Sequence, residues 1–553
     1  MFNQLKKKGG MLSGHDKTNY KIKKRREYLL RKRQQLMLQQ AYLHKQKLKF
    51  ERLNQQQTQN QLVYSENIVE DEKVKNIEET QSILEISNKN KQKLNENNVK
   101  TGVVITTHGY YGIFARQCLQ SFERELPENY FIVLFINESQ DEITLNLIEK
   151  YENNEKIVVI YNEDQHKSGG LTGTWNKGID LCLENNCDVV VLSNDDILFD
   201  GCINNILWSC YENKEKMQYF GPISNNPGPK NCAINMCQYG VKPIDNKNKI
   251  ALYNDNLCNL NGFFMVFSKK VLIENKFDNN FYFDPEKPFG GNETEWFNRF
   301  KDKKGEPIIV PQTFIYHYKI ARWREGNKEN NTCIYTINTG SYEGTKVYLK
   351  KSNIDTLYFT DNFDCIYNCI NKELLPFYID TRGKDPKLIQ RTVKTNPTLF
   401  LPYNYEKSIY IDGNMFLKNY NYLNYYLNFL ENHDVVCFKH PERNFVLDEA
   451  KKVIDFQLER KDNVEKIVKE MKKNNFKDNE GLCETGILLR NHKKIINFNK
   501  DWCRCINICR RDQVSFDYIL HKNNINYVKH EHIEKWLIIN RVEHLNPVNR
   551  TIM

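Results

Sequence analysis

The sequence predicts an α/β chain with two Rossmann-like domains in tandem, preceded by a long polar helical arm. From residue 101 onward, short apolar runs alternate with polar segments of helix length, which is typical of parallel strands joined by crossover helices. The alternation starts again after residue 331. With 553 residues, the chain also exceeds the size of one ordinary core. We therefore expect domains over residues 101–325 and 331–540, with a C-terminal tail over 541–553.

Residues 1–100 have a different texture. They contain no proline, and Lys-Ile-Lys-Lys-Arg-Arg at 21–26 opens a stretch rich in Lys, Arg, Gln and Leu that runs to about Gln61. An acidic, Asn-rich segment follows to Asn98. This pattern predicts a polar helix, with coiled-coil self-association as one use of it, and then a linker.

Charge and cysteine content narrow the class of protein. Much of the net charge of +10 lies in the first fifty residues, so it describes a tail rather than a groove for nucleic acid. The 16 cysteines are scattered and form no paired CxxC zinc pattern. The sequence shows no transmembrane run, secretory segment or lipidation signal. We expect reduced thiols, no membrane span and a cytoplasmic location.

In the first domain, the expected strands end in polar residues. The apolar runs are Gly102–Thr106, Tyr130–Ile136, Ile157–Ile160 and Val189–Leu192. Ligands of parallel α/β sheets bind beyond the carboxyl ends of the strands. The residues that follow the runs, and so become candidates for binding, are Thr107-His108, Asn137-Glu138, Asn162-Glu163 and Asn194-Asp195-Asp196.

The adjacent carboxylates Asp195 and Asp196 are the most informative of these candidates. Each raises the cost of ionising the other unless a cation lies between them. A divalent metal that carries a diphosphate would provide this cation. An acidic turn after a strand is the alternative interpretation.

Two further segments carry candidate residues. Gly169-Gly170 to Asn176-Lys-Gly178 follows the third run and is expected to open a helix whose free N–H groups face a ligand. It lacks the Lys-Ser/Thr ending of a P-loop, so nucleotide hydrolysis is disfavoured. Further on, Glu293 and Glu295 precede Arg299, and His317 follows. The alternative for Glu293 and Glu295 is an exposed helix start, where the helix dipole favours acidic residues. The alternative for His317 is a histidine of the core.

These motifs together resemble the inverting family 2 glycosyltransferases of GT-A fold, over about residues 101–325. Glu293 stands in the place of that family's catalytic base, with Glu295 as the reserve. Asp196, with Asp195 close by, stands at its metal site, and His317 fits a late histidine that holds metal or diphosphate. The resemblance implies bound Mn²⁺ or Mg²⁺, and donor-binding roles for Thr107, Asn137, Gly169, Gly170, Asn176, Asp195 and Arg299.

The chemistry agrees with these roles. The leaving nucleoside diphosphate gathers negative charge, which a bound metal would neutralise. Inversion needs one carboxylate to take the proton of the acceptor hydroxyl. The chain departs from the family after the second strand. There Ile136 precedes Asn137-Glu-Ser-Gln-Asp141, so the contact of the family's first aspartate with the nucleotide base is missing or replaced.

The second domain has its own motifs. Its expected strands are Cys333–Ile337, Thr356–Phe359, Ser408–Ile411 and Asp434–Phe438, and the third of them runs into Asp412-Gly-Asn414. The series of motifs resembles the TOD1/MUCI70-type glycosyltransferase-like domains. That resemblance implies that Asp412 and Asn414 lie near metal, His440 and Arg443 near diphosphate, and Glu484 and Asp512 near sugar. A degenerate domain that only packs or binds sugar is the alternative, and Asp512 with Arg511 could be a structural ion pair.

The leading hypothesis is a glycosyltransferase, bifunctional if both domains act, that uses a nucleotide-sugar donor and a glycan or glycoprotein acceptor. A nucleotidyltransferase shares the strand-to-carboxylate geometry, but it needs a glycine-rich loop with Lys or Arg directly after the first strand, which Thr107-His108-Gly109 does not supply. A third hypothesis is a non-enzymatic sugar-binding or nucleic-acid-binding scaffold led by the basic arm.

Overall fold

The computed structural model describes most of the chain from residue 82 onward. The described residues are 82–108, 112–138, 142–225, 243–253, 255–278, 280–318, 331–340, 343–401, 405–417, 420–531 and 539–541. The predicted basic helix, its self-association and the C-terminal tail lie outside these residues. Within them, no helix is both long enough and apolar enough to cross a bilayer.

The first described element is a helix over residues 82–96, in the segment where the sequence indicated a linker. Ile83 and Leu94 give it a buried face, and the Asn90 side chain donates a hydrogen bond of 3.0 Å to Asn205 Oδ1. Leu84 packs at Gly201, where any side chain would displace it. These spaced apolar residues, not the surrounding charge, fix the helix against the first domain.

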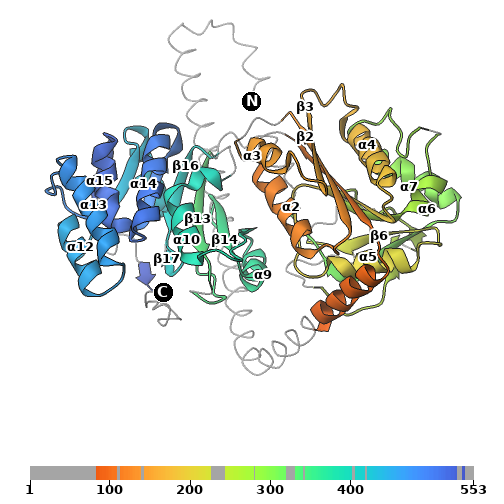
Figure 1. Cartoon of the computed structure of the whole chain (residues 1–553), viewed down its shortest axis with the longest axis horizontal. Helices are drawn as coiled ribbons and strands as arrows, with labels where there is room; N and C mark the ends of the chain where they lie inside the picture. The colour runs from red at the N-terminus through yellow and green to blue at the C-terminus, as the bar shows by residue number, and fades with distance from the viewer. Residues whose placement is uncertain are drawn as a thin grey trace, which may run out of the picture. The chain divides into compact units, whose positions relative to one another are not determined.

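The first domain is built on one eight-stranded sheet with the order β3-β2-β1-β4-β10-β6-β11-β7 (Figure 1). Strand β10 runs antiparallel to both β4 and β6. The strands are β1 (Thr101–His108), β2 (Tyr130–Asn137), β3 (Ile157–Asn162), β4 (Val189–Asn194), β6 (Gln218–Ile223), β7 (Lys249–Ile250), β10 (Phe264–Ser268) and β11 (Glu306–Phe314).

Helices cover both faces of this sheet, because its central strands are apolar on both sides. Val104 and Leu192 point into one buried cluster, and Val103 and Val191 into another. Helices α4 (Gly170–Glu184), α6 (Lys269–Glu274) and α7 (Asn292–Asp302) pack on the first face; α2 (Gly112–Glu125), α3 (Glu142–Tyr151) and α5 (Ile203–Glu212) pack on the second. Two short ribbons complete the domain, β5 (Ile197–Leu198) with β12 (Tyr316–His317) and β8 (Leu252–Tyr253) with β9 (Asn256–Leu257).

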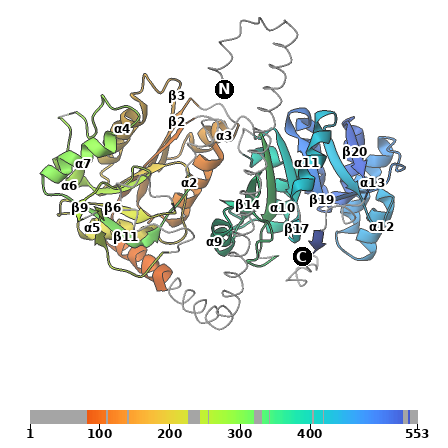
Figure 2. The same ribbon diagram turned by 180° about the vertical axis from the view of Figure 1, so that it is seen from behind.

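The second domain repeats this plan with seven strands in the order β15-β14-β13-β16-β19-β18-β20 (Figure 2). Strand β19 is antiparallel to its neighbours β16 and β18. The strands are β13 (Thr332–Asn338), β14 (Asp355–Thr360), β15 (Leu375–Tyr378), β16 (Lys407–Ile411), β18 (Val435–Lys439), β19 (Cys483–Asn491) and β20 (Tyr527–His530), with β17 (Met415–Leu417) and β21 (Ile539–Arg541) in a separate ribbon.

The helices of the second domain lie between these strands in the sequence. They are α9 (Phe363–Asn371), α10 (Pro386–Thr395), α11 (Asn421–Leu427), α12 (Val446–Asp455), α13 (Lys461–Lys473), α14 (Ile496–Ile508) and α15 (Asp512–Lys522), with short 3₁₀ turns at Pro397–Leu399, Asn428–Glu431 and His492–Lys494.

The two main sheets share one topology. Numbered within each domain, the seven strands common to both follow the order 3-2-1-4-6-5-7, with the sixth strand antiparallel. Both sheets are mixed, and in both the antiparallel strand lies beside the fourth strand. Two unrelated α/β sheets would not be expected to share this arrangement. For the described residues, the predicted α/β class with two Rossmann-like sheets in tandem is confirmed.

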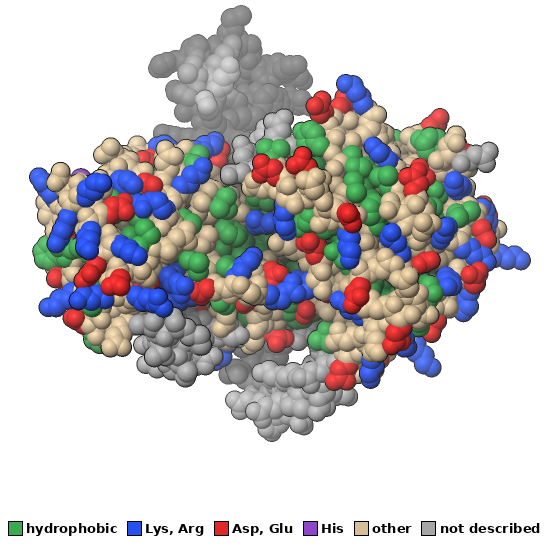
Figure 3. All heavy atoms as spheres, in the orientation of Figure 1, with side chains coloured by type: hydrophobic (Ala, Val, Ile, Leu, Met, Phe, Trp, Pro, Cys, Tyr) green, Lys and Arg blue, Asp and Glu red, His purple; other side chains and the backbone are tan. Residues whose placement is uncertain are grey.

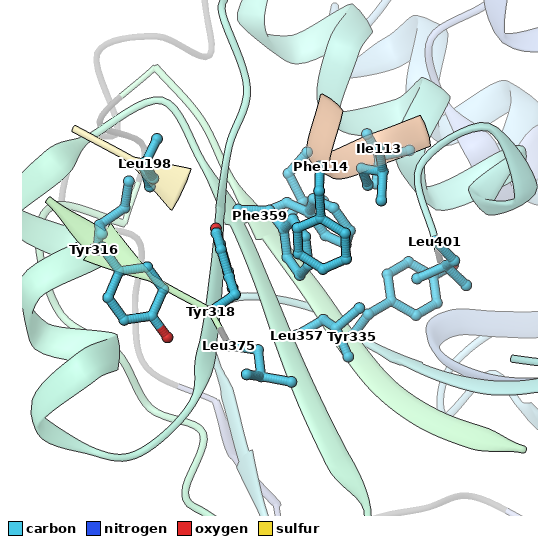
Figure 4. Close-up of a cluster of buried hydrophobic side chains, with 14 of the residues drawn as sticks. Ile113, Phe114, Leu198, Tyr316, Tyr318, Tyr335, Leu357, Phe359, Leu375 and Leu401 are labelled. Atoms are coloured by element: carbon cyan, nitrogen blue, oxygen red, sulfur yellow. The ribbon is translucent and has the colours of Figure 1, made fainter. Parts of the chain in front are cut away.

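The two domains are joined by a buried aromatic cluster (Figure 4). Phe114 of α2 lies 5.0 Å from Tyr318 and 5.4 Å from Phe377 of β15, measured between ring centroids. Gln117 donates to the Tyr318 hydroxyl at 2.9 Å and accepts from the Tyr378 backbone at 2.8 Å. A single hydrophobic cluster therefore extends through residues of both sheets.

The described surface carries mixed charge. On the face shown in Figure 3, Lys and Arg side chains are interspersed with Asp and Glu. This distribution differs from a continuous basic stripe, the usual footprint of a nucleic-acid site.

Candidate functional site

Asp195 and Asp196 lie directly after β4, at the carboxyl end of the central strands, and both are buried. The short ribbon of β5 and β12 pairs His317 with Ile197, which brings the imidazole to the carboxylate before Ile197. The His317 Nε2 atom lies 3.4 Å from Asp196 Oδ2. The structure thus brings together two groups that are 121 residues apart and were both predicted to hold metal.

The His317 side chain is held from several directions. Its ring stacks on Phe263, with 4.5 Å between centroids. The Asn225 side chain accepts from the His317 N–H at 2.8 Å and donates to the His317 carbonyl at 3.2 Å. The following Tyr318 N–H donates to the Asp196 carbonyl at 2.9 Å. Backbone hydrogen bonds therefore hold Asp196 and His317 in place, in addition to any electrostatic attraction between their side chains.

The donor chemistry of this pair fits a divalent cation that also takes ligands from a substrate. Among the residues that the structure describes, no group of three or more His, Cys, Asp and Glu side chains is arranged to hold a metal. Asp196 and His317 alone would supply one oxygen and one nitrogen, leaving the other positions to diphosphate oxygens and water. A nitrogen ligand suits Mn²⁺ better than Mg²⁺, which prefers oxygen.

Glu293 lies in the first turn of α7, close to the same strand end. A Cβ placed on Gly262 would lie 3.4 Å from the Glu293 carboxyl carbon, so this carboxyl group packs on the Gly262 backbone. The next residue, Phe263, stacks on His317 and accepts a hydrogen bond of 2.9 Å from the Asn194 N–H. Gly262 and Phe263 therefore connect Glu293 with the Asp196 rim. Among the described residues, Glu293 forms no ion pair.

Glu295, the reserve candidate for the base, has a different environment. Arg299 binds it through two contacts, Nε to Oε1 at 2.5 Å and Nη2 to Oε2 at 3.1 Å. Arg299 also donates to the Tyr282 carbonyl at 2.9 Å and to the Asn275 carbonyl. Both side chains are thus engaged in fastening α7 to the loop before it, whereas the sequence assigned Arg299 to the donor.

The glycine segment opens a helix as predicted, with α4 beginning at Gly170. Gly169 and Gly170 have φ of 80° and 65°, which glycine adopts at little cost. A Cβ on Gly170 would lie 2.6 Å from the Pro288 carbonyl oxygen. The close backbone approach that the glycines allow is therefore to the 288–289 loop of the same domain.

Asn176 is engaged on the same helix. Its Nδ2 donates to the Phe283 carbonyl at 3.0 Å, and its Oδ1 accepts from the N–H groups of Tyr282 and Phe283 at 3.0 and 2.9 Å. This amide holds the loop that leads toward α7. Through this loop Asn176 positions Glu293 indirectly. The hydrogen bonds also occupy the Asn176 amide, for which the sequence predicted a contact with the nucleotide-sugar donor.

The ends of β1 and β2 bring together two of the residues that follow the apolar runs of the sequence, His108 and Glu138. Thr107 is buried, and the Asn137 Oδ1 atom accepts from Asn162 at 2.8 Å. Next to them, the Glu138 carboxylate accepts from the Gln165 N–H at 2.9 Å and lies 3.4 Å from His108 Nε2. Glu138 is about one-third exposed, so the end of β2 carries a partly accessible carboxylate. His108 is aligned with Asn137 across β1 and β2, which brings its imidazole to the neighbouring Glu138 carboxylate.

In the second domain, the structure brings Asp412 and Asp512 together around a lysine. The Lys394 Nζ atom, on the last turn of α10, lies 3.3 Å from Asp412 Oδ1 and 2.5 Å from Asp512 Oδ2. It also donates to Thr485 Oγ1 at 3.3 Å. Lys394 is 1% exposed. No motif marked this residue, because it lies on a helix 18 positions before Asp412.

Asp512 is strongly stabilised as a carboxylate. Burial by itself would raise its pKa, but Arg391, Lys394 and the Thr485 hydroxyl lower the pKa well below its usual range. Arg391 Nη1 lies 3.3 Å from Asp512 Oδ1. The resemblance placed a metal at Asp412 and Asn414, but the Lys394 ammonium lies against the Asp412 carboxylate. The residues present do not fit a divalent cation here.

The other predicted residues of the second domain form a second group of contacts. The His440 and Arg443 side chains meet with 2.7 Å between Nε2 and Nη2. Arg443 Nε also lies 2.7 Å from the buried Glu449 carboxylate. Glu484 is buried at the start of β19, opposite Phe438.

The two sites occupy equivalent places in the repeated topology. The Asn194 N–H bonds to the carbonyl before β10, and the Asp412 N–H bonds to the Gly486 carbonyl in β19, so Asn194 corresponds to Asp412 and Asp196 to Asn414. Glu293 and Asp512 each lie in the first turn of the last helix before the seventh strand. At this place the first site has a carboxylate that forms no ion pair with a described residue, and the second has a carboxylate that contacts two cations.

Comparisons with known proteins assign neither a family nor a function to the chain. No family model and no curated protein sequence matches the chain. Similar solved structures include GalNAc-T7 with UDP, GalNAc and Mn²⁺, at TM-score 0.30 and 15% identity over 40% of this chain and 44% of that one. S. aureus TarS matches at TM-score 0.30 and 14% identity over 41% of this chain and 38% of TarS, or 63% of its fragment 1–349. The chain covers less than two thirds of each, and such distant likeness transfers no function.

Proposed function

We propose that the first domain is a glycosyltransferase that moves a sugar from a nucleotide-sugar donor to a glycan or glycoprotein hydroxyl with inversion. One observation carries the proposal. The Glu293 carboxylate, which makes no ion pair with a described residue, lies on the same rim as Asp196 and His317. A base and a site for the leaving diphosphate are thus adjacent, as a single displacement requires.

The residues divide the reaction between them. Glu293 accepts the proton of the acceptor hydroxyl while that oxygen bonds to the anomeric carbon. The bond from this carbon to the diphosphate oxygen breaks, and its electron pair leaves with the nucleoside diphosphate. A divalent cation, Mn²⁺ or Mg²⁺, held by Asp196 and His317 would supply the charge that stabilises this leaving group. Arg299 and Asn176 act by holding the loop and helix that present Glu293.

The carboxylates of α7 give the sharpest test. We expect Glu293→Gln to lower kcat by about a thousandfold, because general base catalysis contributes at this level. The melting temperature should stay near that of the parent chain, because Glu293 makes no ion pair within the described residues. The assay is release of nucleoside diphosphate from a panel of UDP-, GDP- and dTDP-sugars with Mn²⁺ and with EDTA.

Glu295→Gln is the matched control. It removes one of the two charges from the Arg299 contact and should lower stability while changing kcat less than Glu293→Gln. Equal loss of kcat in both variants would contradict the assignment of the base. Absence of donor binding and turnover across the whole panel would end the transferase proposal.

A further inference from the structure

We propose that the second domain carries a binding site for a phosphate-bearing anion that works without a divalent metal, with the Lys394 ammonium in the metal's place. The site concerns residues of α10 and α15 and does not depend on sugar transfer by the first domain. Its failure and the failure of the transferase proposal can therefore be observed separately.

Lys394 fills the role of a resident cation. An ammonium group has three N–H donors, and three protein oxygens lie within reach of it: Asp512 Oδ2 at 2.5 Å, Asp412 Oδ1 at 3.3 Å and Thr485 Oγ1 at 3.3 Å. The backbone beneath it is fixed, because the buried Arg490 donates to the Lys394 carbonyl at 2.7 Å. Moving this side chain out to admit a metal would leave a buried charge without compensation.

A row of cations leads from Lys394 toward the surface. Lys387, Arg391 and Lys394 are four and three residues apart on α10, so they share one face of that helix. Arg511 immediately precedes α15, and Asp512 of that helix contacts both Arg391 and Lys394. Within the described part of the chain, Lys387 and Arg511 form no ion pair. Lys387 and Arg511, both half-buried, thus face each other. They lie beside Arg391 and Lys394, whose charges are already balanced by Asp412 and Asp512.

This arrangement costs free energy unless an anion is present. Burial lowers the pKa of Lys387, and repulsion from Arg511 and Arg391 lowers it further, while Glu459 opposes the shift. Glu459 is itself engaged by the Arg510 N–H at 2.8 Å, and Arg510 pairs with Asp385 at 2.5 Å. Lys394 and Arg391 balance Asp412 and Asp512, which leaves Lys387 and Arg511 to meet a doubly charged group. A phosphate or diphosphate matches this charge and the fork of an arginine.

The test uses the full chain carrying Asp196→Ala, so that the first domain cannot hold metal at its strand end. Inorganic pyrophosphate is titrated in the presence of EDTA by calorimetry, and UDP in a second arm. We expect pyrophosphate to bind in EDTA, which would show that the site needs no divalent metal. Tighter binding of UDP would identify a nucleotide as the source of the anion, and equal constants would identify a free phosphate group.

Replacing the two unpaired cations should weaken this binding. Lys387→Ala with Arg511→Ala is expected to raise the dissociation constant about tenfold or more, since charged hydrogen bonds are lost. Lys384→Ala, an exposed lysine before α10, should leave it unchanged. Because Lys387 and Arg511 form no described ion pair and repel each other, the melting temperature of the double variant should not fall below that of the parent chain. Absence of binding in EDTA, or equal binding by the double variant, would overturn the proposal.

Discussion

At the scale of single residues, ion pairing distinguishes carboxylates that the sequence presents alike. Glu293 and Glu295 lie two positions apart, yet among the described arginines there is one that binds Glu295 and none that binds Glu293. Asp512 begins a helix as Glu293 does, but two cations surround it. An acid whose ionised form is stabilised this strongly is a weak base, so we expect the second domain to lack a general base at the place equivalent to Glu293.

The lowered pKa of Asp512 predicts how stability depends on pH. The folded carboxylate holds its proton less tightly than the unfolded one, whose pKa is near 3.8. Its contribution is therefore fully present above about pH 5 and is lost progressively as the pH falls through the unfolded pKa toward the folded one. Asp512→Asn should lower the free energy of unfolding by about 3 kcal/mol at pH 7, because Lys394 loses its nearest carboxylate. Urea titrations at pH 7 and pH 3 should show this difference shrinking in acid; a difference independent of pH would contradict it.

How far the sequence predicts a residue depends on where its partners lie. Asp196 and Glu293 stand in short motifs at the ends of elements, so local pattern sufficed to nominate them. Lys394 does not, because its role comes from Asp412 and Asp512, which reach it only after the sheet and α15 have formed. Asn176 and Arg299 have polar side chains suited to a ligand, and only the structure shows that backbone groups occupy them.

At the scale of elements, the start of α4 depends on glycine for two separate reasons. Gly170 has a positive φ of 65°, and a Cβ there would lie 2.6 Å from the Pro288 carbonyl. Gly383 has a similar φ of 69° but open space around it. We expect Gly383→Ala to cost about 1 kcal/mol for the backbone conformation alone. Gly170→Ala should cost about 1–3 kcal/mol more, because the 288–289 loop must shift. Chemical denaturation measures both, and equal losses would show that the loop yields freely.

The elements themselves were largely accessible from the sequence. The apolar runs beginning at Gly102 and Val189 became central strands because both faces are buried, which is what an unbroken apolar run indicates. The helix over residues 82–96 was not foreseen, since its apolar positions are sparse among Asn and Lys. It is stabilised by contacts such as that of Asn90 with Asn205, which no local pattern reveals.

At the scale of the whole molecule, the repeated strand order indicates that one architecture carries two sites with different chemistry. The first places the Asp196 carboxylate beside the His317 imidazole, and the second places the Lys394 ammonium between Asp412 and Asp512. Because Tyr318 follows His317 and packs on Phe377, the interface of the domains lies one residue from the first site. Changes at this interface should therefore reach Asp196 through the backbone hydrogen bond from Tyr318.

The shared cluster also predicts how the described part of the chain unfolds. Phe114 is fully buried between the aromatic rings of both domains, so the two sheets should lose structure in one transition. Phe114→Ala should lower stability by about 3–5 kcal/mol, as is usual for a large buried aromatic, and should separate one calorimetric transition into two. Phe456→Ala, at a position 67% exposed, is the control and should leave a single transition. Two transitions in the parent chain, with only the first shifted by Phe114→Ala, would show instead that each sheet is stable without the other.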